Sequence, residues 1–107
     1  MKHSQILIIG ARGQLGMALQ AKYPEAKAVD SDTLDITDIT ALQKYNWSNI
    51  KVIINAAAYT NVDGAETVEG RRIAWQVNAV APARLSKIAN KNNITLVHIS
   101  TDYVFYG

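Results

Sequence analysis

Three glycines at fixed spacing form the first segment of the chain whose composition could bind a ligand. Gly10, Gly13 and Gly16 give the pattern Gly-x-x-Gly-x-x-Gly directly after the apolar run Ile6–Ile9. Glycine permits a tight turn, lets backbone approach a pyrophosphate, and lets a following helix pack closely on the preceding strand. The motif alone is also compatible with an ordinary glycine-rich turn. Its position between a predicted strand and a predicted helix favours a dinucleotide site, because a helix start attracts phosphates.

An acidic residue follows Gly10 at the interval typical of dinucleotide sites, about 20 residues. This residue, Asp30, ends a second apolar run, and its carboxylate could accept hydrogen bonds from the hydroxyls of a ribose. A carboxylate here would repel a 2′-phosphate, and no arginine adjoins Asp30 in the sequence. These two features favour NADH over NADPH. The alternative is that Asp30 is only a turn residue at a strand end.

Two more polar segments follow apolar runs. The segment Asn55–Thr60 contains three consecutive alanines, which would leave the backbone open to a flat ligand, with the hydroxyl of Thr60 beside it. Tight packing at a sheet edge would explain these alanines equally well. Thr101 and Asp102 follow the last apolar run. Both segments are therefore candidate parts of the same site.

The elements that must position these segments alternate between strand and helix. Short apolar runs predict strands at Ile6–Ile9, Ala26–Asp30, Ile50–Asn55 and Ile94–Ser100. Helical spacing predicts helices at Gln14–Lys22, from a cap at Thr37 to about Tyr45, and from about Arg71 to Lys91. This alternation predicts an α/β fold, with a Rossmann-like parallel sheet in the order 3-2-1-4 and flanking helices. The carboxyl ends of parallel strands share one edge, so the four polar segments are expected to meet there.

One residue interrupts the last predicted helix. Pro82 has no N–H group, so the helix is expected to kink there or to lose the hydrogen bond at the carbonyl of Asn78.

Composition excludes several other classes of function. The chain has 107 residues, enough for one domain, and 49% of them are hydrophobic. It contains no cysteine, which excludes disulfide scaffolds, cysteine-ligated zinc and iron–sulfur clusters. The net charge is only +2 and the basic residues are dispersed, so we expect no nucleic-acid partner. No apolar stretch approaches the length of a membrane span, about 20 residues, so we expect a cytoplasmic protein without a membrane contact.

No metal site is predicted either. The acidic residues between positions 30 and 38 lack the glycine and the terminal glutamate of a calcium-binding loop. The two histidines, His3 and His98, have no carboxylate at ligand spacing, and we expect both to be structural.

Taken together, the segments resemble the extended short-chain dehydrogenase/reductase family, and within it the reductases of dTDP-linked sugars. The resemblance covers the whole chain and rests on five stretches: GARGQLG (10–16), LDITD (34–38), VIINAAAYTNVDGAE (52–66), VNAVAP (77–82) and VHISTDYVF (97–105). The glycine motif alone is common to many proteins. The alanine-rich and STDYVF stretches are the specific ones.

The resemblance implies a role for residues in each segment. The implied cofactor contacts are the glycine turn at Gly10 and Gly16, the pyrophosphate at Gly13, Gln14 and Leu15, the ribose at Asp30, the adenine at Asp35 and Ile36, and the path to the nicotinamide at Ala58, Tyr59 and Thr60. Thr101 matches the catalytic hydroxyl that polarises the substrate carbonyl, and Asp102 would bind the sugar. The implied reaction is hydride transfer from NADH or NADPH to the 4-keto carbon of a dTDP-linked 6-deoxyhexose.

In this family a tyrosine donates the proton, and a lysine four residues later stabilises the phenolate. Tyr23 and Lys27 match that spacing, but Pro24 prevents a regular helix from placing both on one face. We therefore expect the pair beyond Gly107. Residues 1–107 are then expected to be a truncated NAD(P)-binding Rossmann domain, without the C-terminal substrate domain and inactive alone.

Two other functions stay open: a regulatory subunit that only binds the nucleotide, and an epimerase or dehydratase of another nucleotide sugar. The last strand would present an open sheet edge, so a homodimer or association through that edge is also expected.

Overall fold

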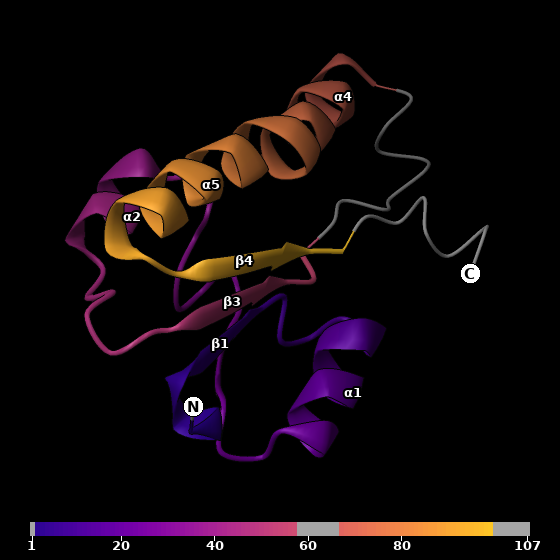
Figure 1. Ribbon diagram of the computed structural model, residues 1–107. Coiled ribbons are helices and arrows are strands. Elements are labelled where there is room, and N and C mark those ends of the chain that lie inside the picture. Colours follow the sequence, from indigo (N-terminus) through magenta and orange to yellow (C-terminus); the bar gives the residue numbers. More distant parts are fainter. Residues whose placement is uncertain (1, 58–66, 100–107) are drawn as a thin grey trace.

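The computed structural model describes residues 2–57 and 67–99 of the chain. Its centre is a four-stranded parallel sheet in the order β2-β1-β3-β4, with helices on both faces (Figure 1). The strands are β1 (Ile6–Ile9), β2 (Lys27–Val29), β3 (Val52–Asn55) and β4 (Thr95–His98). The α/β class and the parallel sheet predicted from the sequence are confirmed.

The two faces of the sheet are covered by different helices. Leu7 and Ile9 of β1 belong to the larger core, which includes Leu42 of α2 (Ile39–Lys44) and Leu85 of α5 (Ala81–Asn92). Ile6 and Ile8 belong to a smaller core against α1 (Gln14–Lys22), on the opposite face. Side chains alternate between the faces of a strand, so covering both faces buries all four residues of β1.

The predicted strand order, 3-2-1-4, is wrong. The third strand does not extend the sheet beyond β2; it pairs with the free side of β1, with Ile6 opposite Val52 and Ile9 opposite Asn55. The physical reason is burial. A central strand needs apolar neighbours on both sides, and β3 is buried at three of its four residues, whereas β2 is buried only at Val29. The more apolar strand therefore takes the inner position, and β2 becomes an edge.

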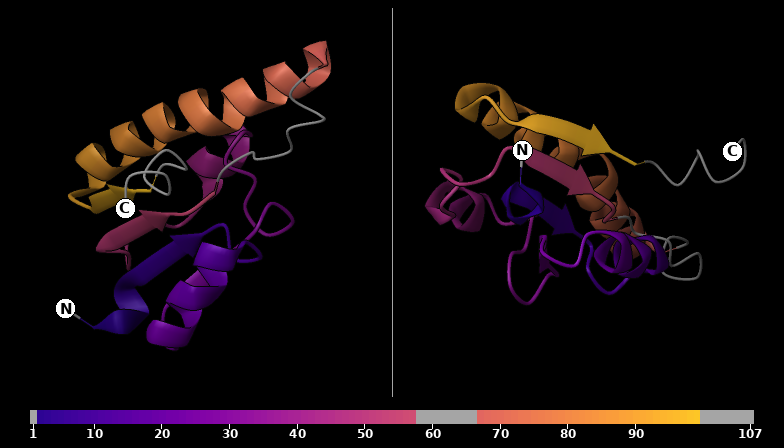
Figure 2. Two further views of the ribbon diagram at one scale, coloured as in Figure 1. Left: turned by 90° about the vertical axis from the view of Figure 1, so that its right-hand side faces the viewer. Right: turned by 60° about the horizontal axis from the view of Figure 1, so that its bottom comes forward.

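This order places a topological switch point between β1 and β3. The chain leaves β1 toward α1 on one face, and the next helices after β3 lie on the other face (Figures 1 and 2). Neighbouring strands whose connections diverge in this way leave a crevice at their carboxyl ends, which is where open α/β sheets bind ligands.

Local signals set the ends of the helices. Helix α1 has the bounds predicted from the sequence. The predicted cap of α2, Thr37, is wrong: the cap is Asp38, whose carboxylate accepts from the amides of Thr40 (3.0 Å) and Ala41 (3.3 Å). Thr37 instead donates its hydroxyl to Asp35 (2.6 Å). A carboxylate at this position also compensates the positive end of the helix dipole.

The last predicted helix is one continuous rod of three parts, α4 (Val68–Trp75), the π-helical η2 (Gln76–Val80) and α5 (Figure 2). The widened turn lies directly before Pro82, and within it the Ala81 N–H donates to the carbonyl of Gln76. A π turn shifts the hydrogen-bond register by one residue, and this is how the helix accommodates a residue with no N–H. In the part of the chain that the structure describes, no helix is both long enough and apolar enough to cross a membrane.

Candidate functional site

A pocket of about 310 Å³ lies at the carboxyl edge of the sheet, at the switch point. Its lining comes from the loop after β1 (Ile9, Gly10, Arg12, Gly13), the loop after β2 (Asp30, Ser31, Leu34, Asp35, Ile36, Thr37), the end of β3 (Ala56, Ala57) and η2 (Val77). Three of the four polar segments singled out in the sequence thus meet at one edge, as predicted. The fourth begins after β4, which runs parallel to the other strands.

Any side chain at Gly10 would be strained. Its φ angle is +93°, in the region that L-residues with a side chain rarely adopt. A Cβ atom at Gly10 would lie 2.8 Å from the carbonyl carbon of Ala56 and from the nitrogen of Ala57. The loop also donates the Gly10 and Ala11 amides to the carbonyl of Val29, at 3.0 and 3.1 Å. The glycine turn is therefore wedged between the ends of β2 and β3.

The other two glycines differ in what surrounds them. A Cβ atom at Gly16 would lie 1.9 Å from the carbonyl oxygen of Gly10, so close packing of α1 on the turn requires glycine there. Among the residues that the structure describes, a Cβ atom at Gly13 would meet only that same oxygen, at 3.6 Å, an ordinary contact. Packing among these residues therefore explains Gly10 and Gly16 but not Gly13, which lies exposed on the pocket wall.

Gly13 is also the N-cap of α1, and it has no side chain to satisfy the first amides of the helix. The amides of Gln14, Leu15 and Gly16 have no carbonyl four residues earlier within the helix. The first turn carries no acidic residue, so the positive end of the helix dipole is uncompensated there. These amides, beside an uncovered glycine, could hold the pyrophosphate of a dinucleotide.

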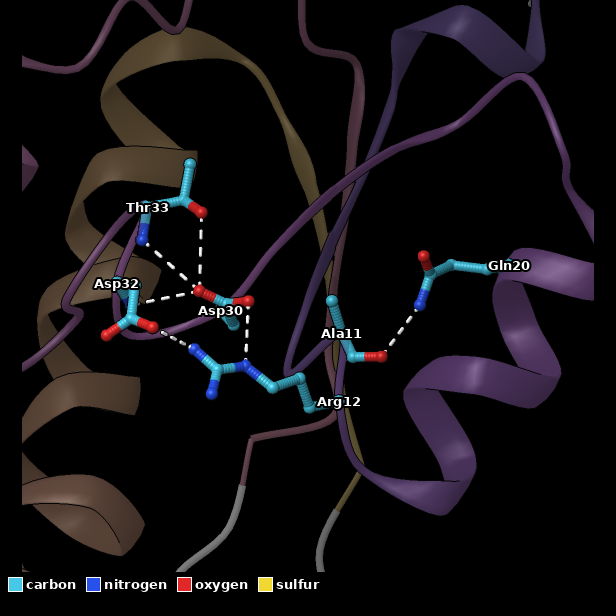
Figure 3. Close-up of polar contacts among 6 residues, drawn as sticks. All are labelled: Ala11, Arg12, Gln20, Asp30, Asp32 and Thr33. Atoms are coloured by element: carbon cyan, nitrogen blue, oxygen red, sulfur yellow. Dashed lines mark hydrogen bonds and ion pairs between the residues drawn. The ribbon is translucent and has the colours of Figure 1, made fainter.

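Asp30 lies directly after β2 and lines the pocket, and its orientation is fixed by its own turn. Its Oδ1 atom accepts from the amides of Asp32 (2.9 Å) and Thr33 (3.3 Å). Its Oδ2 atom accepts from Nε of Arg12 at 2.9 Å (Figure 3). Hydrogen bonds from Arg12, the largest cause, and from the Asp32 amide and Thr33 lower the pKa of the Asp30 carboxyl from 3.8 to about 2.

Arg12 was not among the site residues predicted from the sequence. No arginine adjoins Asp30 along the chain, but in the structure Arg12 bonds Asp30 through Nε and Asp32 through Nη2, and so bridges both carboxylates (Figure 3). The pairing of β1 with β2, with Ile9 opposite Val29, brings the two loops together. Knowing which strands pair would have revealed this contact, but spacing along the chain could not.

The turn after β2 supplies the remaining wall of the pocket. Leu34 and Ile36 are buried in the larger core, whereas Asp35 is exposed and accepts from the amide of Thr37 at 2.9 Å. Asp35 and Ile36, expected beside an adenine, both line the pocket, so an apolar base could lie against this turn.

A second contact that sequence reasoning missed holds the end of β3. The side chain of Asn55 is fully buried; its Oδ1 accepts from the Ala57 amide (3.1 Å) and its Nδ2 donates to Nδ1 of His98 (3.1 Å). The amide thus fixes the turn that faces Gly10 and ties it to β4. His98, expected to be structural, has this structural role.

Several predicted site residues cannot be placed. Ala58, Tyr59, Thr60, Thr101 and Asp102 lie outside the described residues.

Tyr23 and Lys27, which have the catalytic spacing in the sequence but not the expected helix between them, lie away from the pocket. Tyr23 ends α1 and packs edge-on against His3, while Lys27 is the first residue of β2. Both are therefore at the amino edge of the sheet, away from the pocket at the carboxyl edge.

Comparison with known proteins gives a consistent result. A family model described as "RmlD substrate binding domain" matches residues 4–107. The chain belongs to this family. It is 40% identical to the dTDP-4-dehydrorhamnose reductase of Mycobacterium tuberculosis, over 99% of this chain and 35% of that protein. It is 44% identical to the dTDP-4-dehydrorhamnose reductase of Mycolicibacterium smegmatis, over 94% of this chain and 31% of that protein.

A solved structure shares the fold of this member of the RmlD family. The crystal structure of a dTDP-4-dehydrorhamnose reductase from Clostridium acetobutylicum matches with a TM-score of 0.82 and 40% identity, over 97% of this chain and 37% of that one. The family resemblance drawn from the motifs is confirmed. The chain spans about a third of the length of the curated relatives it matches.

Proposed function

We propose that this chain forms the nucleotide-binding part of an NAD(P)H-dependent reductase that converts dTDP-4-dehydro-6-deoxy-L-mannose into dTDP-L-rhamnose, a precursor of cell-surface polysaccharides. The observation that carries the proposal is the contrast among the three glycines. Gly10 and Gly16 are required by contacts within the chain, whereas Gly13 faces the pocket with room for a Cβ atom. A glycine at a position where the described packing does not require one is accounted for by a ligand that approaches the backbone closely.

The described residues fit an adenine dinucleotide lying across the edge of the sheet. The amides of Gln14 and Leu15 at the start of α1, beside Gly13, would hold the pyrophosphate. Asp30, whose Oδ1 accepts from its own turn, would accept the ribose hydroxyls at Oδ2, which also accepts from Nε of Arg12. The turn that contains Asp35 and Ile36 lines the pocket and would hold the adenine.

The segments that follow β3 and β4 would hold the nicotinamide end in this proposal. When bound, the reduced nicotinamide would supply the hydride that the 4-keto carbon of the sugar accepts. In the proposed mechanism Ala58, Tyr59 and Thr60 line its path, the hydroxyl of Thr101 polarises the keto oxygen, and Asp102 binds the sugar. Hydrogen bonds to an oxygen that gains negative charge lower the barrier to hydride transfer.

The proton donor is expected outside the described residues. The tyrosines that the structure describes, Tyr23 and Tyr45, both end helices that lead into the amino ends of strands, and Lys27 lies 5.2 Å from the ring of Tyr45. Neither can reach a sugar at the carboxyl edge. Neither of the two described tyrosines is therefore the proton donor of the proposed reaction.

The relatives support a reductase over the other two functions. The curated relatives described above, which match nearly the whole chain, carry the name of a 4-keto-sugar reductase. The nucleotide is NADH or NADPH. The carboxylate of Asp30 favours NADH, but Arg12 donates to that carboxylate and so reduces its repulsion of a 2′-phosphate.

The test is to incubate the purified full-length protein with dTDP-4-dehydro-6-deoxy-L-mannose and NADH or NADPH, and to identify the product by NMR. Formation of dTDP-L-rhamnose with loss of absorbance at the nicotinamide band supports the proposal. Tight nucleotide binding without any product indicates the regulatory subunit instead. An altered sugar without net oxidation of the nucleotide indicates an epimerase or a dehydratase.

A further inference from the structure

We infer that Gln20 is a positioning residue for the pyrophosphate of the nucleotide, although it does not itself line the pocket. Its side-chain amide anchors the carbonyl of Ala11, the second residue of the glycine turn, to helix α1. The next amide, that of Arg12, is thereby left facing the ligand. The inference rests on the proposed function, because it concerns how the same pocket is held ready for a dinucleotide.

Gln20 lies near the end of α1 and is half-buried against the glycine turn. Its Nε2 atom donates to the carbonyl of Ala11 at 2.7 Å (Figure 3) and to the carbonyl of Gly16 at 3.1 Å. Both neighbours are acceptors, so only the NH₂ end of the side-chain amide can face them, and both of its hydrogens are used. The contact therefore requires a side chain that donates two hydrogen bonds.

The other hydrogen bonds of the turn hold its amides and leave the Ala11 carbonyl to Gln20. The amides of Gly10 and Ala11 donate to the carbonyl of Val29, and the amide of Gly13 donates to the carbonyl of Gly10 at 3.2 Å. Among the described residues, the carbonyl of Ala11 accepts from Gln20 alone. Removing this donor would leave the peptide between residues 11 and 12 free to rotate.

The anchored carbonyl sets the direction of the following amide. The peptide between Ala11 and Arg12 is trans, so the Arg12 N–H points away from the Ala11 carbonyl and hence away from α1. Figure 3 shows Gln20 on one side of Ala11 and the side chain of Arg12 on the other side, toward Asp30. Arg12 and Asp30 both line the pocket. The Arg12 amide is therefore directed to the side on which the ligand would lie.

This amide adds a donor to those at the start of α1. Within the part of the chain that the structure describes, the amides of Arg12, Gln14 and Leu15 have no hydrogen-bond partner. All three surround Gly13, and successive backbone amides of this kind can hold the oxygens of a pyrophosphate. A rotated peptide would turn the Ala11 carbonyl oxygen toward the phosphates in place of the N–H, and Gln20 opposes that rotation.

Calorimetry on the full-length protein tests the inference with two probes, ADP-ribose, which contains the pyrophosphate, and adenosine, which lacks it. Gln20→Leu removes the donor and keeps a side chain of similar bulk. It is expected to weaken the binding of ADP-ribose about tenfold, while the binding of adenosine changes less than about twofold.

A second variant, Gln20→Asn, separates the turn from the helix. An asparagine can still donate to the carbonyl four residues earlier, as Asn92 does to Ile88 at 2.8 Å. It is one methylene too short for the carbonyl of Ala11, so it is expected to weaken ADP-ribose as much as Gln20→Leu does.

Kinetics and NMR distinguish positioning from support of the fold. Contacts with the pyrophosphate are the same before and during the reaction, so in Gln20→Leu the KM for the nucleotide is expected to rise about tenfold, far more than kcat changes. The amide resonance of Arg12 is expected to shift when ADP-ribose binds to the wild-type protein. In Gln20→Leu that shift is expected to be much smaller.

The matched control is Gln43→Leu. Gln43 is an exposed glutamine of another helix, α2, and does not line the pocket. This substitution makes the same chemical change on the surface, and it is expected to leave the affinity for both probes and the KM unchanged.

Equal weakening of ADP-ribose and adenosine in the Gln20 variants would mean that Gln20 only supports the fold, and would overturn the inference while leaving the proposed function intact. Unchanged affinity for ADP-ribose would overturn it as well, and so would an Arg12 resonance that does not respond to ADP-ribose in the wild-type protein. If the wild-type protein bound neither ADP-ribose nor NADH nor NADPH, the proposed function would fail together with the inference.

Discussion

At the scale of single residues, the glycine motif separates into positions that the fold requires and one that the ligand requires. The sequence presents Gly10, Gly13 and Gly16 as equivalent members of one pattern. Only the packing around each shows that a Cβ atom is excluded at two of them and accommodated at the third. The pattern therefore predicted the site, and the structure identifies Gly13 as the glycine that internal packing among the described residues does not require.

This separation predicts opposite outcomes for two similar substitutions. Gly16→Ala would put a Cβ atom 1.9 Å from the Gly10 oxygen, so it is expected to lower the free energy of unfolding by about 1–3 kcal/mol or more. Gly13→Ala, at a φ of −72°, is expected to change it by less than about 1 kcal/mol. Urea denaturation of both variants measures the difference. Equal destabilisation by the two substitutions would contradict the assignment.

The ion pair of Arg12 predicts a pH effect at Asp30. The pKa of Asp30 is about 2 because Arg12 donates to it, so Arg12→Gln is expected to raise that pKa toward its ordinary value of 3.8. A lowered carboxyl pKa stabilises the folded state above pH 4, and this contribution is lost as the pH falls from about 4 to about 2. NMR titration of the Asp30 carboxyl carbon reports the midpoint. A midpoint that stays near 2 in the variant would show that the turn amides, and not Arg12, hold the pKa down.

At the scale of elements, the sequence predicted the secondary structure of each segment better than the position of that segment in the sheet. The apolar run Ile6–Ile9 and the helix Gln14–Lys22 were predicted with the observed bounds, since both depend on local patterns. The strand order was wrong, because hydrophobic runs do not record which side of β1 a later strand will occupy. The contacts Arg12–Asp30 and Asn55–His98 join residues at the ends of neighbouring strands. They could not be predicted without knowing which strands pair.

The buried amide of Asn55 predicts a stability effect that joins two elements. Asn55→Ala would leave the Ala57 amide and Nδ1 of His98 without this partner, at a cost of about 1–3 kcal/mol in the free energy of unfolding. The control is Asn92→Ala, since Asn92 is exposed and donates only to the carbonyl of Ile88 within its own helix. It is expected to cost less than about 0.5 kcal/mol. An equal loss of stability for the two variants in thermal denaturation would mean that the buried hydrogen bonds of Asn55 contribute no more than an exposed hydrogen bond.

At the scale of the whole molecule, the sheet has an open side. In the described residues β4 pairs only with β3, and its burial pattern is mostly exposed, with Val97 at 42%. An unpaired strand offers its backbone groups to another chain.

The open edge predicts association of the 107-residue chain on its own. Sedimentation at rising concentration is expected to show dimers or larger species, and Val97→Lys is expected to reduce them, since a charge on an edge strand opposes pairing. The matched control is Met17→Lys, at an exposed position of α1 away from the edge, which is expected to leave association unchanged. A single monomeric species at high concentration would count against the prediction.

Calorimetric titration of the full-length protein tests whether the carboxyl edge of this sheet binds a nicotinamide dinucleotide over Gly13. Saturable binding of NADH or NADPH at one site is expected, weakened about tenfold or more by Gly13→Val, because the side chain would occupy the place of the pyrophosphate. A folded protein that binds neither nucleotide, or that binds as tightly after Gly13→Val, would contradict it.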